Sequence, residues 1–365
     1  MSARLDINLI NLKHNIDSFK TRLIKNQQLL VMIKADAYGA GMIEVAKCLS
    51  KEGVTHFGVA YLKEAKKLRK SGIRGEIIVF SGLVPSEIRE AVNIDAIYSV
   101  SDFHILEALN KQAKVENKTV NVEIAIDTGM TRLGFNKEDI VELAKRLNQL
   151  DNINVHGVYT HLSQADSSTK FTKKQIQAFD ECIRVFNEYQ INYRYVHLCN
   201  SAGILKYNSE KYNLVRLGIG AYGYPPDKSM KQDINIKGIF KLTAPVCYIR
   251  CVNAGREVSY GGSFVTKKPT KLAVLQIGYA DGLTRTLSNK YTVLIGGKQA
   301  KIVGNICMDT CMIDVTDIDV KLGDEAIIFD YTDDKIEQLA LLTDTIVYEI
   351  ITNIGKRVDR NYIIE

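Results

Sequence analysis

Eight short apolar segments, separated by segments with helical spacing, dominate the first 217 residues of this chain. The apolar segments lie at 29–34, 57–60, 76–80, 95–99, 120–127, 153–161, 194–198 and 213–217. Strands that alternate with helices in this way form βαβ units with a parallel sheet, and eight such strands close a (β/α)₈ barrel. The pattern therefore predicts an α/β fold with a TIM barrel; an open, doubly wound sheet is the alternative.

The pattern changes after Pro225 and Pro226. Predicted strands now follow one another across glycine turns, at 237–252, 271–277, 291–296, 300–305, 311–315 and 325–330, and helical spacing returns only at 335–342 and 348–354. Successive strands without intervening helices are typical of a β-rich domain. We expect a barrel domain over residues 8–235 and a C-terminal β domain over 236–365. A short N-terminal strand within 1–7 fits either domain.

Charge and cysteine content restrict the classes of partner. The 365 residues carry a net charge of +6, from 48 basic and 42 acidic residues without a basic block, so we expect no nucleic-acid partner. No apolar segment reaches the roughly 18 residues that a membrane span needs. Seven scattered cysteines are typical of reduced thiols in the cytoplasm. Because no histidine lies beyond His197, we expect no metal site, and Cys247, Cys251, Cys307 and Cys311 are predicted to be buried.

A lysine ends the first apolar segment of the predicted barrel. Lys34 follows the apolar run 29–33, and the carboxyl ends of barrel strands form the active face of such folds. An amine held there loses hydration, which lowers its pKa from about 10.4 and populates the neutral nucleophile. Lys34 is therefore a candidate Schiff-base lysine. The alternative is a solvated lysine at the end of a strand.

Later strands of the predicted barrel also lead into polar or glycine-rich residues. Ser201 and the glycines at 218 and 220 can present backbone N–H groups to a phosphate. A reactive lysine beside a phosphate cradle indicates pyridoxal phosphate. His161 would pack on its ring, and Arg216 would face the ring nitrogen and leave it unprotonated, because arginine keeps its proton. The alternatives are a capped helix, a core histidine and a structural salt bridge.

The motifs around these residues resemble those of alanine racemases, which are pyridoxal-phosphate enzymes with a barrel and a C-terminal β domain. The resemblance extends from about residue 5 to residue 360. Its most specific parts are KADAYGAG at 34–41, DTGMTRLGF at 127–135, YTHLSQAD at 159–166, NSAG at 200–203, VRLGIGAYGYPP at 215–226, VSYGG at 258–262, IGYADG at 277–282 and CMD at 307–309. Eight motifs in order are far more specific than any one alone. The resemblance implies a homodimeric, two-base racemase that interconverts L- and D-alanine and supplies D-alanine for peptidoglycan.

The resemblance also implies roles for individual residues. Lys34 matches the lysine that holds the cofactor and acts as one base, and Tyr260 matches the opposite base, which the family supplies from the partner subunit. The cofactor-binding positions match Tyr38, His161, Asn200, Ser201, Arg216, Gly218 and Ile219. The substrate-binding positions match Arg132, Tyr279, Met308 and Asp309. Without the resemblance, VSYGG indicates only a turn whose tyrosine covers a sheet.

Several positions depart from the family pattern. Ala125 stands where many members have a lysine, often carbamylated, that holds the arginine matched by Arg132, so we expect a bound anion such as chloride beside Arg132. The other departures are Asp36 for asparagine, Ala40 for histidine, Asn305 for arginine and Lys356 for a phosphate-binding tyrosine. They leave serine or a broader set of amino acids open as the substrate.

Two other function classes resemble this chain less closely. Single-barrel proteins that bind pyridoxal phosphate for cofactor homeostasis lack the β domain and the tyrosine of VSYGG. Fold-related decarboxylases resemble this chain less at IGYADG and VRLGIG.

Overall fold

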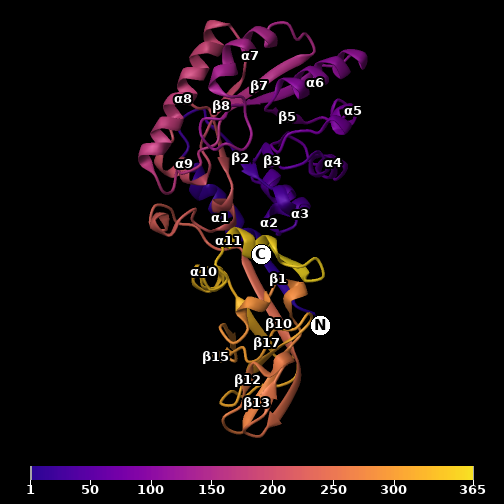
Figure 1. Ribbon diagram of the computed structural model, residues 1–365, viewed down its shortest axis with the longest axis vertical. Helices are drawn as coiled ribbons and strands as arrows, with labels where there is room; N and C mark the ends of the chain where they lie inside the picture. The colour runs from indigo at the N-terminus through magenta and orange to yellow at the C-terminus, as the bar shows by residue number, and fades with distance from the viewer. Residues whose placement is uncertain (1, 365) are drawn as a thin grey trace.

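The computed structural model describes residues 2–364, except for the side chains at 333 and 334. The chain forms two units that lie end to end: a barrel of strands surrounded by helices, and an elongated unit built mostly of strands (Figure 1). The predicted α/β barrel followed by a β-rich unit is confirmed.

Eight parallel strands form the barrel: β2 (Gln28–Met32), β3 (His56–Val59), β4 (Glu76–Val79), β5 (Ile97–Val100), β6 (Val120–Ala125), β7 (Ile153–Tyr159), β8 (Tyr195–His197) and β9 (Leu214–Leu217). Neighbouring strands pair in the order β8-β7-β6-β5-β4-β3-β2-β9. The two end strands meet through backbone hydrogen bonds from Asn213 N to Val196 O (3.2 Å) and from Arg216 N to Cys199 O (3.0 Å). The barrel is therefore nearly closed, and its strands bring their carboxyl ends to one face.

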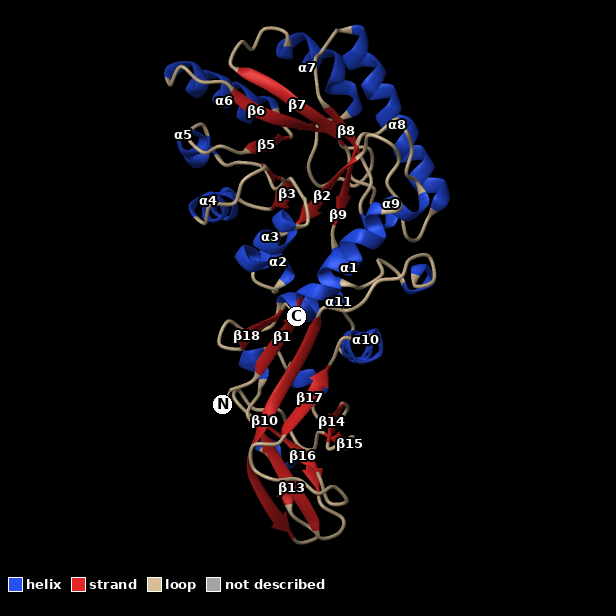
Figure 2. Cartoon of the chain, turned by 180° about the vertical axis from the view of Figure 1, so that it is seen from behind, coloured by secondary structure: helices blue, strands red, loops and turns tan. Residues whose placement is uncertain are grey.

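The helices that accompany these strands are α1 (Leu9–Lys20), α2 (Lys34–Tyr38), α3 (Met42–Lys51), α4 (Leu62–Lys70), α5 (Ile88–Ala91), α6 (Phe103–Val115), α7 (Ile140–Leu147), α8 (Thr169–Glu188) and α9 (Ser201–Lys206). They lie around the outside of the strands (Figure 2). Helix α8 buries Phe179, Cys182 and Phe186, which recur every three or four residues and so share one face. The side chain of Ser168 accepts the Phe171 N–H and fixes where α8 begins.

The second unit contains an eight-stranded sheet. Its strands are β1 (Arg4–Asn8), β10 (Phe240–Val252), β13 (Thr270–Leu275), β14 (Thr292–Ile295), β15 (Lys298–Lys301), β16 (Cys311–Asp314), β17 (Glu325–Phe329) and β18 (Asp359–Ile363). The long strand β10 pairs with β1, β13 and β17. The N-terminal strand thus lies in this second sheet, where β1 also pairs in parallel with β18.

Smaller elements complete this unit. A two-stranded ribbon of β11 (Glu257–Val258) and β12 (Phe264–Val265) lies apart from the main sheet. Helices α10 (Asp333–Leu342) and α11 (Val347–Thr352) follow β17. Helix α11 packs closely on the barrel, because a Cβ on Gly39 would lie only 2.4 Å from the Ile351 carbonyl oxygen.

Some details differ from the sequence expectations. The first barrel strand ends at Met32, two residues early, because the chain enters a left-handed turn beside Lys34. Strand β15 spans Lys298–Lys301 instead of 300–305. Cys247 and Cys251 are exposed, because they lie on the outer half of β10, beyond the buried core. Among residues 2–364, no helix has the length and apolar character to cross a bilayer, and no group of three metal-ligating side chains is found.

Candidate active site

A cavity of about 210 Å³ opens at the carboxyl ends of the barrel strands. The structure brings together there the barrel residues that the sequence assigned to the site, namely Lys34, Tyr38, Arg132, His161, Asn200, Ser201, Arg216, Gly218 and Ile219. They come from β9 and from the segments that follow β2, β6, β7, β8 and β9. Residues far apart in the sequence thus share one enclosed space.

Lys34 stands at the start of a left-handed turn. The next four residues, Ala35–Tyr38, have φ angles between 52° and 55°, a conformation that costs about 1–2 kcal/mol per non-glycine residue. The Glu64 carboxylate accepts a hydrogen bond from Ala35 N (2.8 Å), and Asp36 Oδ1 accepts one from Met42 N (3.0 Å). Hydrogen bonds from outside and within the turn therefore hold it at the edge of the cavity.

The environment of the Lys34 amine favours its neutral form. Burial lowers the pKa of Lys34, and the positive charge of Arg132 lowers it further. Glu64 opposes this shift, whereas Arg216 adds to it. A lowered pKa increases the fraction of neutral amine, which is the form that attacks a carbonyl carbon or accepts a proton.

One end of the cavity has the chemistry of a phosphate cradle. Ser201 Oγ accepts hydrogen bonds from Gly218 N (3.0 Å) and Gly220 N (3.4 Å). A Cβ at position 218 would lie 3.0 Å from Tyr38 Oη and 3.7 Å from Ser201 Oγ, so glycine keeps this space open. The Ser201 hydroxyl and the Tyr38 phenol border the open space over Gly218 and can donate hydrogen bonds to a phosphate group there.

The alternative interpretation of Ser201 is that it only caps a helix, but the cap of α9 is Asn200. The Asn200 side chain accepts the Gly203 N–H at 2.9 Å, and Ser201 is the first residue of α9. The Ser201 hydroxyl is therefore directed to the 218–220 loop, which is why it belongs to the cradle.

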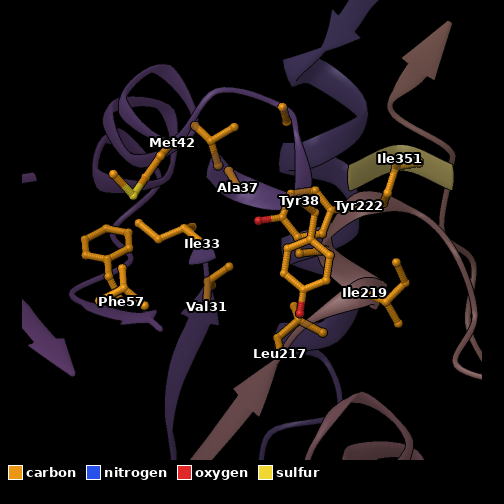
Figure 3. Close-up of a cluster of buried hydrophobic side chains, with 14 of the residues drawn as sticks. Val31, Ile33, Ala37, Tyr38, Met42, Phe57, Leu217, Ile219, Tyr222 and Ile351 are labelled. Atoms are coloured by element: carbon orange, nitrogen blue, oxygen red, sulfur yellow. The ribbon is translucent and has the colours of Figure 1, made fainter. Parts of the chain in front are cut away.

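Tyr38 and Tyr348 line the cavity beside the cradle, and the buried Tyr222 packs against Tyr38 (Figure 3 shows Tyr38 and Tyr222). The rings of Tyr38 and Tyr222 stack with their centroids 4.5 Å apart, and the ring of Tyr348 from α11 lies 6.2 Å from that of Tyr38. Tyr348 lines the cavity, whereas Lys356 is exposed and does not. Nothing in the sequence marks Tyr348, because it lies more than 120 residues from the other residues that line the cavity and its segment shows only helical spacing.

Arg216 forms a buried cationic floor. It is 3% exposed and donates hydrogen bonds to the carbonyl oxygens of Thr160 (2.8 Å) and Leu198 (3.2 Å). Its other partners are Nδ1 of His197 and Nδ1 of His161 (3.3 Å). Burial, reinforced by Arg216 and the other nearby cations, lowers the pKa of His161 to about 3, so this ring is neutral.

Arg132 differs from Arg216 because it has no partner among the residues that the structure describes. It is exposed at the cavity wall, and it makes no hydrogen bond or ion pair within the part of the chain that the structure describes. Ala125, at the end of β6, is 2% exposed and offers it no polar group. The cavity thus holds a fixed cation, Arg216, at its floor and at its wall a second arginine without a partner in the described chain, an arrangement that attracts anions.

The residues that the sequence assigned to the site from the β-rich unit do not line this cavity. Tyr260, between β11 and β12, is 75% exposed, and Tyr279 and Met308 are 43% and 53% exposed. Asp309 forms an ion pair with Arg357 (2.7 Å). Figure 1 places β12 and β13 at the end of the molecule opposite the barrel, and Figure 2 places β13 there as well. Within one chain, Tyr260 and Lys34 therefore do not meet.

Comparison with known proteins accounts for both units. Two family models match, namely "Alanine racemase, N-terminal domain" over residues 7–226 and "Alanine racemase, C-terminal domain" over residues 239–362. Alanine racemase 1 of Caldanaerobacter subterraneus subsp. tengcongensis is 36% identical across 99% of this chain and 94% of its own length.

Solved structures agree with the sequence comparison. The alanine racemase of Clostridium difficile 630 superposes with a TM-score of 0.95 at 34% identity, covering 100% of this chain and 96% of that one. The alanine racemase of Bartonella henselae, whose structure contains covalently bound pyridoxal phosphate, has a TM-score of 0.89 at 30% identity and covers 100% of both chains. By sequence and by structure, this chain belongs to the alanine racemase family.

Proposed function

We propose that this chain is a pyridoxal-phosphate-dependent racemase that interconverts L-alanine and D-alanine with one base from each of two copies of the chain. The observation that carries the proposal is a lysine with a lowered pKa in the same cavity as a phosphate cradle and a buried arginine. Family membership supports alanine as the substrate.

The residues that line the cavity fit pyridoxal phosphate. The cradle of Ser201, Gly218, Ile219 and Tyr38 would hold the phosphate, and Lys34 would bind the aldehyde carbon. The bound cofactor supplies an electron-withdrawing ring that makes the α-hydrogen of an amino acid acidic. Arg216 would donate a hydrogen bond to the ring nitrogen without giving up its proton, which limits the electron withdrawal and the side reactions that follow from it.

Racemisation needs a proton acceptor on one face of the α-carbon and a proton donor on the other. The neutral amine of Lys34 suits one face, because burial and the nearby arginines lower its pKa and so favour the form that accepts a proton. We assign the opposite face to the phenol of Tyr260 from a second copy. Its exposure in the single chain supports this assignment, since the side chain is free to enter a neighbouring cavity.

The surface around Tyr260 has the character of a subunit interface. Exposed aromatic and apolar side chains gather on this unit, among them Tyr248 (55%), Tyr279 (43%) and Met308 (53%). Aromatic residues and methionine are enriched at interfaces. We propose a homodimer with twofold symmetry, in which each β-rich unit brings Tyr260, Tyr279, Met308 and Asp309 to the other copy's cavity.

Arg132 is placed to bind the carboxylate of the amino acid. It lies in the cavity wall with Lys34 and has no competing protein partner among the described residues. We propose that a small anion such as chloride occupies the space beside Ala125 and orients the guanidinium. Serine or a broader range of amino acids is the second candidate, because the small side chain at 125 gives Arg132 more freedom to move.

We also propose a cytoplasmic location, in which the enzyme supplies D-alanine for peptidoglycan. The seven cysteines of the described chain are all free, as expected of a protein in a reducing compartment.

Mixed dimers provide the test of the shared site. Lys34→Ala copies and Tyr260→Phe copies, each inactive alone, are co-expressed with different tags, and D-alanine formation is measured for the purified mixture. If the two bases come from different copies, each mixed dimer has one intact site, and about a quarter of wild-type activity returns. If both bases act within one chain, the mixture stays inactive. Assays of the wild type with L-alanine and L-serine decide the substrate.

A further inference from the structure

A chain of charged and polar side chains, most of them buried, crosses the barrel below the cavity. Arg216 contacts His197 Nδ1, His197 Nε2 lies 3.0 Å from Glu123 Oε2, and Glu123 Oε1 lies 3.4 Å from His156 Nδ1. His156 Nε2 is 3.1 Å from Glu76 Oε2. These residues come from β9, β8, β6, β7 and β4, so the chain leads from the floor of the cavity toward the opposite end of the barrel.

We propose that Glu123, which lies outside the cavity, is a positioning residue that acts through His197 to hold Arg216 in place beneath the cofactor. The inference rests on the proposed function, since Arg216 faces the ring only if pyridoxal phosphate binds there.

The protonation of His197 follows from its two neighbours. Arginine has no acceptor, so Arg216 must donate to Nδ1 of His197, and this nitrogen carries no proton. The proton of the neutral ring is then on Nε2, where it can be donated only to the Glu123 carboxylate. Burial lowers the pKa of His197, which agrees with a neutral ring. Glu123 thus fixes the ring by its far nitrogen and leaves the near nitrogen free to accept from Arg216.

Glu123 is also the carboxylate nearest to Arg216 in this chain of contacts. Both residues are buried, at 0% and 3% exposure, and the direct partners of Arg216 are carbonyl oxygens and ring nitrogens. His156 lies on the other side of Glu123. Burial acts to lower the pKa of His156, but its contacts with Glu123 and Glu76 outweigh this effect and raise the pKa to about 9, so the ring is cationic. Glu123 is therefore a buried anion between two cations.

The cost of this arrangement argues for a role in the site. Barrel interiors are usually filled with branched apolar side chains. Replacing a buried ionic group by such side chains is often neutral or stabilising, so packing alone does not require the chain of charges. Of the residues in this chain of contacts, Arg216 is the one that lines the cavity, so it links the buried charges to the site.

The test compares Glu123→Gln with Glu76→Gln in the full-length protein, with and without pyridoxal phosphate. Glu76 is the matched control, because it also contacts two histidines but does not touch His197. With six histidines in the chain, nitrogen-15 labelling of histidine resolves each ring. We expect the wild-type His197 signal to show a proton on Nε2 alone. In Glu123→Gln that N–H resonance moves upfield, because its acceptor is no longer charged.

Activity and the absorption band of the bound cofactor complete the comparison. Glu123→Gln should lower kcat roughly 10- to 100-fold, the range found when a metal-bound histidine loses its outer hydrogen-bond partner, with KM little changed and the absorption band shifted. Glu76→Gln should leave both near the wild-type values. A proton on His197 Nδ1 in the wild type, unchanged kcat and band in Glu123→Gln, or equal effects of the two variants would each overturn the proposal. The wild-type spectrum decides even if Glu123→Gln does not fold, and it is independent of whether alanine is racemised.

Discussion

The barrel and the β-rich unit hold their functional residues in opposite ways. In the barrel, Lys34, Arg216 and Ser201 converge on one cavity within a single chain, and hydrogen bonds to neighbouring strands and loops fix Arg216 and Ser201. In the β-rich unit, Tyr260 is 75% exposed, and its ordering comes through its backbone, whose carbonyl accepts a hydrogen bond from Asn305 Nδ2 (2.7 Å). A buried site is organised by its own chain, whereas an exposed one acquires its function from the surface that covers it.

Lys34→Arg tests the residues that the barrel contributes, and it should have the largest effect on the rate of racemisation. Arginine keeps the charge but does not lose its proton, so it can neither bind the cofactor covalently nor accept a proton. We expect racemisation to fall by at least about 10⁴-fold, the upper range for one positioned base. D-alanine formation and the absorbance of retained cofactor measure this. Lys63→Arg, at an exposed lysine over the Tyr61 ring, is the control and should be fully active. Substantial activity in Lys34→Arg would remove Lys34 from the reaction.

Tyr260→Phe addresses the other half. The variant removes a phenol that is exposed in the single chain, so the fold and the cofactor absorbance should be unchanged. Racemisation should fall by roughly 10²- to 10⁴-fold, as expected for one general acid–base group. Tyr248→Phe, at a tyrosine 55% exposed on the same unit, should stay within about twofold of wild type. Equal activity of the two variants would contradict the assignment of Tyr260 as a base.

The same contrast explains what could be predicted from the sequence. The barrel strands and most strands of the β-rich unit were located, because buried parallel strands appear as apolar runs and antiparallel strands as runs between glycine turns. The short strands β11 and β12 and the C-terminal strand β18 were not predicted. The polar residues at the barrel strand ends, such as Lys34 and Arg216, stood out because nothing in a buried strand requires them. Tyr260 had no such signal: its turn has an ordinary sequence, and only the family resemblance indicated a role.

Other features were not predictable, for physical reasons. The left-handed turn at Ala35–Tyr38 contains no glycine, so its residues carry no preference for positive φ, and neighbouring groups such as Glu64 impose it. Glu123 lies in a strand whose alternation of polar and apolar residues suggests an exposed face, yet it is fully buried. Its partners His156 and His197 lie 33 and 74 residues away, a pairing that only the closed barrel reveals.

A dependence of KM on chloride would test whether an anion orients Arg132, which has no partner in the described chain, unlike Arg216. If an anion orients Arg132, replacing chloride by gluconate should raise KM for alanine. A surface ion pair contributes up to about 1 kcal/mol, which corresponds to roughly a fivefold change. Ala125→Lys, assayed with bicarbonate so that the amine can be carbamylated, should lose this dependence. A KM that does not respond to chloride in the wild type would contradict the bound anion.

The smallest expected effect is on the free energy of unfolding, which should depend on pH in the barrel but not, through histidine, in the β-rich unit. Burial acts to lower the pKa of His156, but contacts with Glu123 and Glu76 outweigh it and raise the pKa to about 9, above the ordinary 6.5. Because the folded state binds this proton more tightly, the stability it contributes is complete below pH 6.5 and is lost as the pH rises through about 9. Urea unfolding between about pH 6 and pH 9.5 should therefore show a falling free energy of unfolding, with a smaller slope in His156→Gln. The β-rich unit has no histidine, since none lies beyond His197. A tryptophan substituted at Tyr291 would report the unfolding of that unit. If the unit unfolds separately, its free energy of unfolding should not fall with pH as that of the barrel does. The same slope in wild type and His156→Gln would show that the barrel charges do not hold this proton.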